Sequence, residues 1–196
     1  MYLSVLRDSR LYTFLLEVDR DLASQAQESK CRFCGGVLHS ACYLRKPRGL
    51  PAGIDPGPEY PVRFSFCCSV EGCRRRHTPP SARFLGPKVY LAVMVALLTA
   101  MRQGPTRRSL SELGATFGVG RRTLGRWRVW WRSVFVESEF WRRMASRFLP
   151  PVPPADLPAS LIERFQGDTL LARIVRALTF LSEWVTTPRS SPKSAF

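Results

Sequence analysis

Six cysteines are the residues whose type and spacing point most directly to chemistry. Cys31 and Cys34 form a Cys-x2-Cys pair followed by two glycines, an arrangement in which one tight turn presents two thiolates to a metal ion. A second group lies beyond a long loop, in the run Cys67-Cys68-Ser-Val-Glu-Gly-Cys73. Four thiolates at tetrahedral corners suit zinc, so the sequence predicts one structural Zn2+ held by Cys31, Cys34, Cys68 and Cys73.

For some of these ligand positions the sequence offers alternative residues. Cys67 can take the place of Cys68, although neighbouring residues of a strand face opposite sides and only one of the two can point at the metal. His77 can replace a cysteine as Cys73-x3-His77, while His39 and Cys42 are more distant spares. Six cysteines could also be ordinary buried thiols or form disulfides. We favour metal because the cysteines fall in close pairs and the N-terminal residues show no signal-peptide pattern.

Positive charge is concentrated in the middle of the chain. The whole chain carries 30 Lys and Arg against 15 Asp and Glu, and residues 60–147 alone hold 17 basic and 4 acidic residues, an excess of 13. Hydrophobic residues make up 45% of the chain, which is enough to build a core and excludes wholesale disorder. A folded protein with such a local excess of charge is expected to bind a polyanion.

Within this basic region the sequence predicts a helix-turn-helix. Two helical segments, 109–117 and 121 to about 136, are separated by a Gly118-Val-Gly turn. Gly114 is small where the second helix would cross closest, and Gly118 can adopt the left-handed conformation that the turn needs. The residues expected to form the shared core are Phe117, Val119, Leu124 and Trp127.

The second of these helices is the expected DNA-reading element, because its N-terminal residues would reach base edges in the major groove. The predicted base contacts are Arg121, Arg122, Thr123 and Arg126, with Arg128 and Arg132 on phosphates. Further phosphate contacts are predicted before the first helix and on both edges of the zinc module, at Arg107, Arg108, Arg45, Lys46, Arg48, Arg74, Arg75 and Arg76. The tryptophans 127, 130, 131 and 141 are expected in a core or a dimer face rather than as stacking platforms for bases.

These features define the expected fold class: mainly α with a small β zinc ribbon, that is, a helix-turn-helix domain plus a zinc-binding module. We divide the chain into an N-terminal helix (1–30), a zinc-ribbon-like module (31–87), a helical domain (88–149) and a C-terminal part (150–196). That last part comprises a proline-rich linker, an amphipathic helix that Asp168 could cap, and a frayed tail. The longest apolar run, 89–101, is too short to span a bilayer, so no membrane partner is expected. We interpret this run as part of a buried helix over 88–103.

Residues 31–132 resemble the N-terminal DNA-binding region of bacterial insertion-sequence transposases and related mobile-element proteins. The resemblance lies in Cys31-x2-Cys34, in Arg63 before the second cysteine group, in Cys73, and in the run from Phe117 to Trp127. It implies binding to element-end or operator DNA. The separation of Cys34 from Cys68 is longer than in a compact ribbon, and the nuclease domain of full transposases, with its three metal-binding carboxylates, has no counterpart here.

The sequence therefore predicts a non-catalytic, zinc-stabilised protein of the bacterial cytoplasm, associated with the nucleoid, that binds specific double-stranded DNA. A second copy of the chain or another mobile-element protein are further partners that this hypothesis allows. One alternative is a dimeric transcription regulator that uses the helix at 168–186 as its dimer face. Another is an RNA-binding or assembly protein in which the helical pair merely packs.

Overall fold

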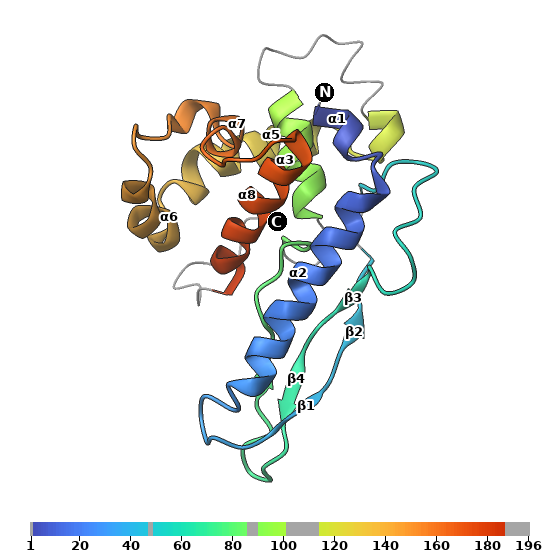
Figure 1. Ribbon diagram of the computed structural model, residues 1–196, viewed down its shortest axis with the longest axis vertical. Helices are drawn as coiled ribbons and strands as arrows, with labels where there is room; N and C mark the ends of the chain where they lie inside the picture. Colours follow the sequence, from blue (N-terminus) through green and yellow to red (C-terminus); the bar gives the residue numbers. More distant parts are fainter. Residues whose placement is uncertain (1, 47–48, 86–89, 101–113, 187–196) are drawn as a thin grey trace.

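The computed structural model describes residues 2–46, 49–85, 90–100 and 114–186. They form a helical head and a narrow stalk that extends away from it (Figure 1). About half of the chain is helical and the strands are short and antiparallel, which confirms the expected mainly α class with a small β part. The head contains α1 (Tyr2–Val5), α3 (Leu91–Ala100), α5 (Arg121–Trp130), α6 (Glu139–Met144), α7 (Ala159–Ile162) and α8 (Leu170–Thr186).

The stalk is built from helix α2 (Ser9–Glu28) and a long β ribbon beside it (Figure 1). The ribbon runs from the far end of the stalk to the head and back again: β1 (Leu38–Ser40) pairs with β4 (Phe66–Cys68), and β2 (Tyr43–Leu44) pairs with β3 (Val62–Arg63). A short strand, β5 (Arg76–His77), adds to the other edge of β4. Helix α2 lies within the N-terminal helix expected at 1–30, and residues 64 and 65 separate β3 from β4.

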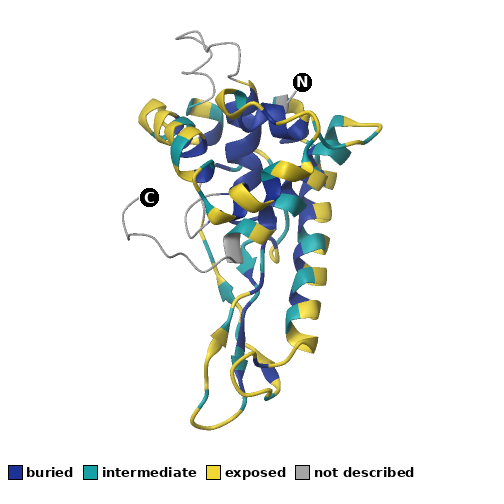
Figure 2. Ribbon diagram, turned by 90° about the vertical axis from the view of Figure 1, so that its left-hand side faces the viewer, coloured by how far each residue is buried: buried dark blue, intermediate teal, exposed yellow. Residues whose placement is uncertain are grey.

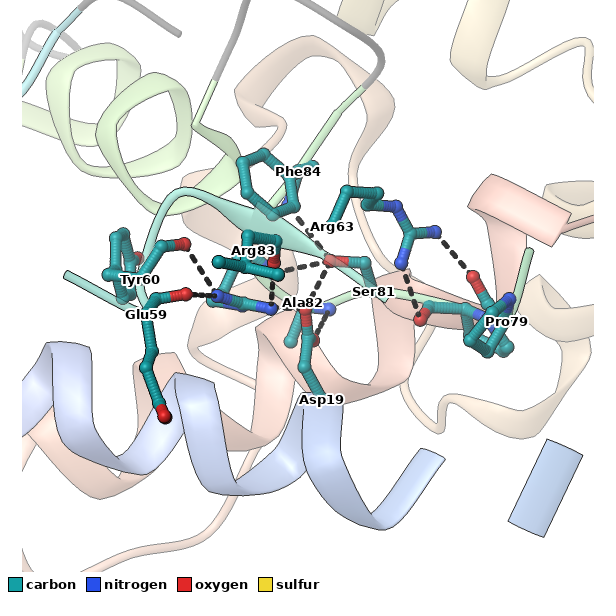
Figure 3. A network of polar contacts seen from close by, with 11 residues as sticks. Asp19, Glu59, Tyr60, Arg63, Pro79, Ser81, Ala82, Arg83 and Phe84 are labelled. Atoms are coloured by element: carbon teal, nitrogen blue, oxygen red, sulfur yellow. Dashed lines mark hydrogen bonds and ion pairs between the residues drawn. The ribbon is translucent and has the colours of Figure 1, made fainter. Parts of the chain in front are cut away.

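A buried ion pair joins α2 to the ribbon. Asp19 and Arg83 are both fully buried, and the Arg83 Nε donates to Asp19 Oδ2 at 2.7 Å (Figure 3). Asp19 also accepts from the Ser81 hydroxyl and the Ala82 amide. The remaining donors of Arg83 reach the carbonyl oxygens of Tyr60 and Val62, at 2.5 Å and 2.9 Å. Both charges of this network therefore have partners, as burial requires.

Arg63 is held in the same region as a structural residue. Its guanidinium is buried and donates to the carbonyl oxygens of Pro79 and Pro80 (Figure 3). Burial lowers its pKa to about 10. The resemblance drawn from the sequence includes Arg63, and the structure shows that this residue fixes the segment after β5 and does not face solvent.

The core of the head surrounds α3, whose residues from Leu91 to Thr99 are all buried (Figure 2). This confirms the predicted buried helix in the apolar run at 88–103, of which the structure describes residues 90–100. None of the described helices combines the length and the apolar character that crossing a bilayer would need. Thr99 sits in this apolar setting because its hydroxyl donates to the Val95 carbonyl one turn earlier.

The C-terminal part packs into the same core. Ile174, Leu178 and Leu181 on α8 are buried in the core of the head. The apolar face of this helix, which the dimeric-regulator alternative uses as a dimer face, is therefore already covered by the same chain. The proline-rich segment predicted as a linker also lies against the head, where Val152 and Leu157 are buried. The predicted capping role of Asp168 is wrong: the hydroxyl of the next residue, Thr169, accepts from the amide of residue 172.

Removing the carboxylate charge of Asp19 should unfold the stalk. We expect Asp19→Asn to lower the free energy of unfolding by about 3–5 kcal/mol, because Arg83 would remain buried without its counter-ion. Asp21→Asn, at an exposed position of the same helix, is the control and should change stability by less than about 0.5 kcal/mol. Urea denaturation followed by circular dichroism measures both, and equal stability of the two variants would show that the pair does not hold the stalk.

Candidate metal centre and arginine surface

Four cysteines meet at the end of the stalk. The Sγ atoms of Cys31, Cys34, Cys68 and Cys73 all lie within 4.8 Å of one another. The Cys31 and Cys73 sulfurs are 3.7 Å apart, and those of Cys34 and Cys68 are 3.4 Å apart. Metal–sulfur bonds of about 2.3 Å at tetrahedral corners place sulfurs about 3.8 Å apart, so the cluster has the dimensions to hold one metal ion. The four residues are the predicted set.

Two tight turns bring the sulfurs together. In the first, the Gly35 amide donates to the Cys31 carbonyl at 2.7 Å and the Cys31 amide donates to the Gly36 carbonyl at 2.9 Å. In the second, the amides of Cys73 and Arg74 both donate to the Val70 carbonyl. Glycine is needed at position 36, because a Cβ there would lie 3.2 Å from the Cys68 sulfur and 2.4 Å from a methyl of Val70.

The surroundings of Cys31 lower the pKa of its thiol, whereas those of Cys68 raise the pKa of its thiol. Removal from water raises the pKa of Cys31, but hydrogen bonds from the backbone amides of Phe33 and Cys34 and from the His77 ring outweigh this and bring it to about 6. Removal from water raises the pKa of Cys68 to about 12, and its sulfur neighbours add to the effect. A bound cation would favour the thiolate form of all four residues, because metal binding displaces the protons.

The alternative ligands that the sequence offers all lie outside the cluster. Cys67 faces the other side of β4, as predicted, and its sulfur lies 3.3 Å from the Arg74 carbonyl. Cys42 is exposed, with its sulfur 3.3 Å from the Ser40 hydroxyl, and His39 is exposed as well. His77 lies outside the cluster but touches it: its Nε2 is 3.3 Å from the Cys31 sulfur, the position of a residue that orients a ligand.

The second candidate surface is the outer face of α5. This helix continues directly into a π-helical turn, η1 (Trp131–Phe135), in place of the uniform helix predicted to about residue 136. Trp127, Trp130 and Trp131 are buried, which confirms the expectation that these tryptophans are core residues. The wider π turn lets two consecutive tryptophans and Phe135 share one inward face, since it shifts the phase of the following residues.

The outer face of α5 and η1 is basic and carries no acidic residue. Arg121, Arg122, Arg126 and Arg132 are exposed, Arg128 is half-buried at the flank, and Thr123 accepts a hydrogen bond from Arg126. None of the five arginines forms an ion pair with any residue that the structure describes. Gly125 lies between them, and a Cβ on it would meet nothing within 4 Å. Val129, which the sequence pattern did not single out, is 64% exposed on this face.

The turn before α5 has the predicted local features. Residues 114–117 are helical, Gly118 has a φ of 61°, and a Cβ on Gly114 would lie 3.4 Å from the Val119 carbonyl oxygen. The four predicted core residues, Phe117, Val119, Leu124 and Trp127, are all buried. Most of the first helix predicted for the motif, residues 109–113, lies outside the described residues, as do Arg107 and Arg108.

The basic residues predicted on the zinc-ribbon-like module differ in their exposure and in their hydrogen bonds. Arg45 is half-buried and donates to the Tyr43 hydroxyl at 2.9 Å, while Lys46 is exposed and Arg48 lies outside the described residues. Arg76 is exposed but donates to the Ala41 carbonyl and the Ser65 hydroxyl, so part of its guanidinium already holds the ribbon. Arg74 and Arg75 are exposed beside Cys73.

Replacing a cluster cysteine should abolish metal binding. We expect Cys68→Ser to lose the metal and the thermal stability of the stalk, because metal binding at such a site also contributes folding free energy. Cys67→Ser is the matched control one residue away and should keep one ion per chain, as should Cys42→Ser. Zinc content after gel filtration and thermal melts with and without a chelator measure this. Metal retained in Cys68→Ser but lost in Cys67→Ser would contradict the assignment.

Comparisons with known proteins add no functional assignment to this geometry. The chain matches no protein-family model, and searches of curated proteins and of solved structures also found no match. The function must therefore be argued from the cysteine cluster and from the arginines of α5.

Proposed function

We propose that this protein is a zinc-stabilised, site-specific binder of double-stranded DNA that performs no chemistry of its own, with α5 as the helix that reads the bases. The observation that carries the proposal is the outer face of α5 and η1: five arginines within 12 residues, 121–132, without an acidic residue among them and without an intramolecular ion pair in the described structure. Arginines without an acidic partner inside the protein are the groups that bind phosphates and guanine edges.

Gly125 supports a close approach of DNA to this face. A glycine in mid-helix costs about 1 kcal/mol relative to alanine, and no neighbouring atom of the described chain requires it. A groove wall at this position would explain the missing side chain. Val129, one turn further along, would then lie among the arginines as an apolar contact, of the kind that a thymine methyl group accepts.

Zinc is the metal that we assign to the cysteine cluster. Four thiolates in a small tetrahedral arrangement suit zinc, and four protein ligands leave no coordination position for a reacting water. The ion would hold the two turns of the stalk together as a structural centre. An origin in a mobile element rests on the resemblance of the cysteine pairs and of the run from Phe117 to Trp127 to transposase DNA-binding regions.

Selection of bound duplexes from a random-sequence pool, with zinc-loaded protein at physiological salt, tests the proposal. We expect an enriched motif, since specific sites bind about 10³–10⁷ times more tightly than random DNA. A palindromic motif would indicate that two copies bind together. A pool without enrichment, combined with tighter binding of structured RNA than of duplex DNA in direct competition, would refute the proposal and favour the alternative of an RNA-binding protein.

Arg126→Ala should reduce binding to the selected motif more than binding to random duplex. The expected loss on the motif is about 1–3 kcal/mol, the contribution of one bidentate arginine–guanine contact. Arg142→Ala, an exposed arginine on α6, is the control for net charge. Titrations of both variants against both duplexes measure the difference, and an equal loss on the two duplexes would exclude base reading by Arg126.

Gly125→Ala should change stability and DNA binding in opposite directions. We expect the free energy of unfolding to rise by about 0.5–1 kcal/mol, because alanine favours the helix and its methyl group has open space. Affinity for the selected motif should fall, because the methyl group would meet the groove wall. Thermal melts and titrations on the same sample test this, and unchanged affinity would show that DNA does not approach the helix at Gly125.

A further inference from the structure

An exposed aromatic ring with two arginines on it lies beside the cysteine cluster. Phe33, in the turn between Cys31 and Cys34, is 47% exposed, and the guanidinium carbons of Arg75 and Arg32 are 4.2 Å and 4.8 Å from its ring centroid. The His77 ring packs against the same residue, with the two ring centroids 5.6 Å apart and the ring planes inclined at 60°. We call Arg32, Phe33 and Arg75 the stalk tip.

The stalk tip is tied to the metal centre by its backbone. Arg32 and Phe33 belong to the turn that carries Cys31 and Cys34, and the Arg75 carbonyl accepts from the Cys68 amide at 3.0 Å. One ion bound by both turns would therefore fix the two guanidinium groups relative to each other. Stacking on the ring removes side-chain freedom from each arginine before any partner arrives, which lowers the entropic cost of a contact.

The charge and shape of the stalk tip suit a phosphate. In the described part of the chain neither Arg32 nor Arg75 forms an ion pair, and the nearest acid along the second turn, Glu71, is exposed and also forms none. A guanidinium that rests its face on a ring keeps its N–H edges free for two parallel bonds to phosphate oxygens. Two guanidinium groups already lie over the ring, which disfavours a stacked base as the ligand.

We propose that the stalk tip binds a phosphate of the DNA backbone outside the stretch that α5 reads. The tip lies at the end of the stalk that points away from the head, whereas α5 belongs to the head (Figure 1). The two surfaces would therefore hold one duplex at two separated places. This inference rests on the proposed DNA-binding function and adds to it a second contact, which strengthens binding without contributing sequence preference.

Phosphate ethylation interference on the wild-type protein tests the proposal directly. The probe is a duplex of about 40 base pairs, roughly four helical turns, with the selected motif at its centre. We expect two separated groups of phosphates at which ethylation blocks binding, one within the motif and one beyond it. A single group confined to the motif would overturn the second contact while leaving the proposed function intact. Absence of binding to any duplex would refute the proposed function itself.

A double variant assigns the outer group of phosphates to the stalk tip. In Arg32→Gln/Arg75→Gln we expect the outer group to disappear, the motif preference to remain, and the slope of log affinity against log salt to fall by about 2, because each phosphate that the protein neutralises adds about 0.9 to it. Arg142→Gln/Arg143→Gln on α6 removes the same charge at exposed positions and is the matched control. An equal fall in the control, or an outer group that persists in the tip variant, would overturn the assignment.

Metal content of the variants separates phosphate binding from a purely structural role. Four thiolates and a divalent ion carry a net charge of −2, so the two arginines could instead serve only to neutralise the negative charge of the metal-bound cluster. Under our proposal Arg32→Gln/Arg75→Gln keeps one zinc ion per chain. Arg32→Lys/Arg75→Lys preserves the charge beside the cluster but not the paired N–H edges, so it should keep zinc and bind the outer phosphates more weakly. Zinc loss in the Gln variant, together with unweakened outer phosphate binding in the Lys variant, would assign the arginines to the metal centre alone.

Discussion

The stalk depends on the buried ion pair between Asp19 and Arg83 (Figure 3). Helix α2 leads from Asp19 to Cys31, and the strands that begin at Val62, whose carbonyl Arg83 holds, lead to Cys68. The pair therefore lies between the two segments that deliver the two halves of the cysteine cluster. Since an ion pair without solvent screening tolerates little displacement, it sets the register of α2 against the ribbon at one end, and a metal ion would set it at the other.

Between these two ends the stalk has little else to stabilise it. Its apolar cluster contains only Ala23, Cys31, Leu38, Phe66 and Cys68 as buried members among the described residues, whereas the head has a continuous core around α3 (Figure 2). A unit of this size buries too little apolar surface to offset the entropy of ordering its chain. Directional contacts take the place of a core: the charged network and the cysteine cluster, with the metal ion that we propose for it. The head needs no such support, so the two parts are stabilised by different physical means.

The parts of this arrangement that follow local rules could be predicted from the sequence. Cysteine spacing identified the cluster, apolar periodicity identified α2, and a nearly continuous apolar run identified the buried helix α3. The pairing of Asp19 with Arg83 could not be predicted in this way, because 64 residues separate them. Nothing in the sequence distinguishes either residue from the other charged residues. The exposure of Phe33 was equally hidden, since an aromatic residue beside a metal turn is usually expected to be buried. Periodicity showed that α8 has an apolar face but not that this face packs inside its own chain.

The contacts of one loop join the head and the stalk into a single body. The loop between β2 and β3 reaches the head, where the Ala52 amide donates to the Thr116 carbonyl and the Gly49 backbone lies against Val93 and Val119. Val119 belongs to the turn that begins α5. The ribbon that ends at the cysteine cluster is thus anchored, at its other end, to the helix that presents the arginines. A ligand held at both places would meet surfaces whose separation the fold has already fixed, so that little conformational entropy is lost when the second contact forms after the first.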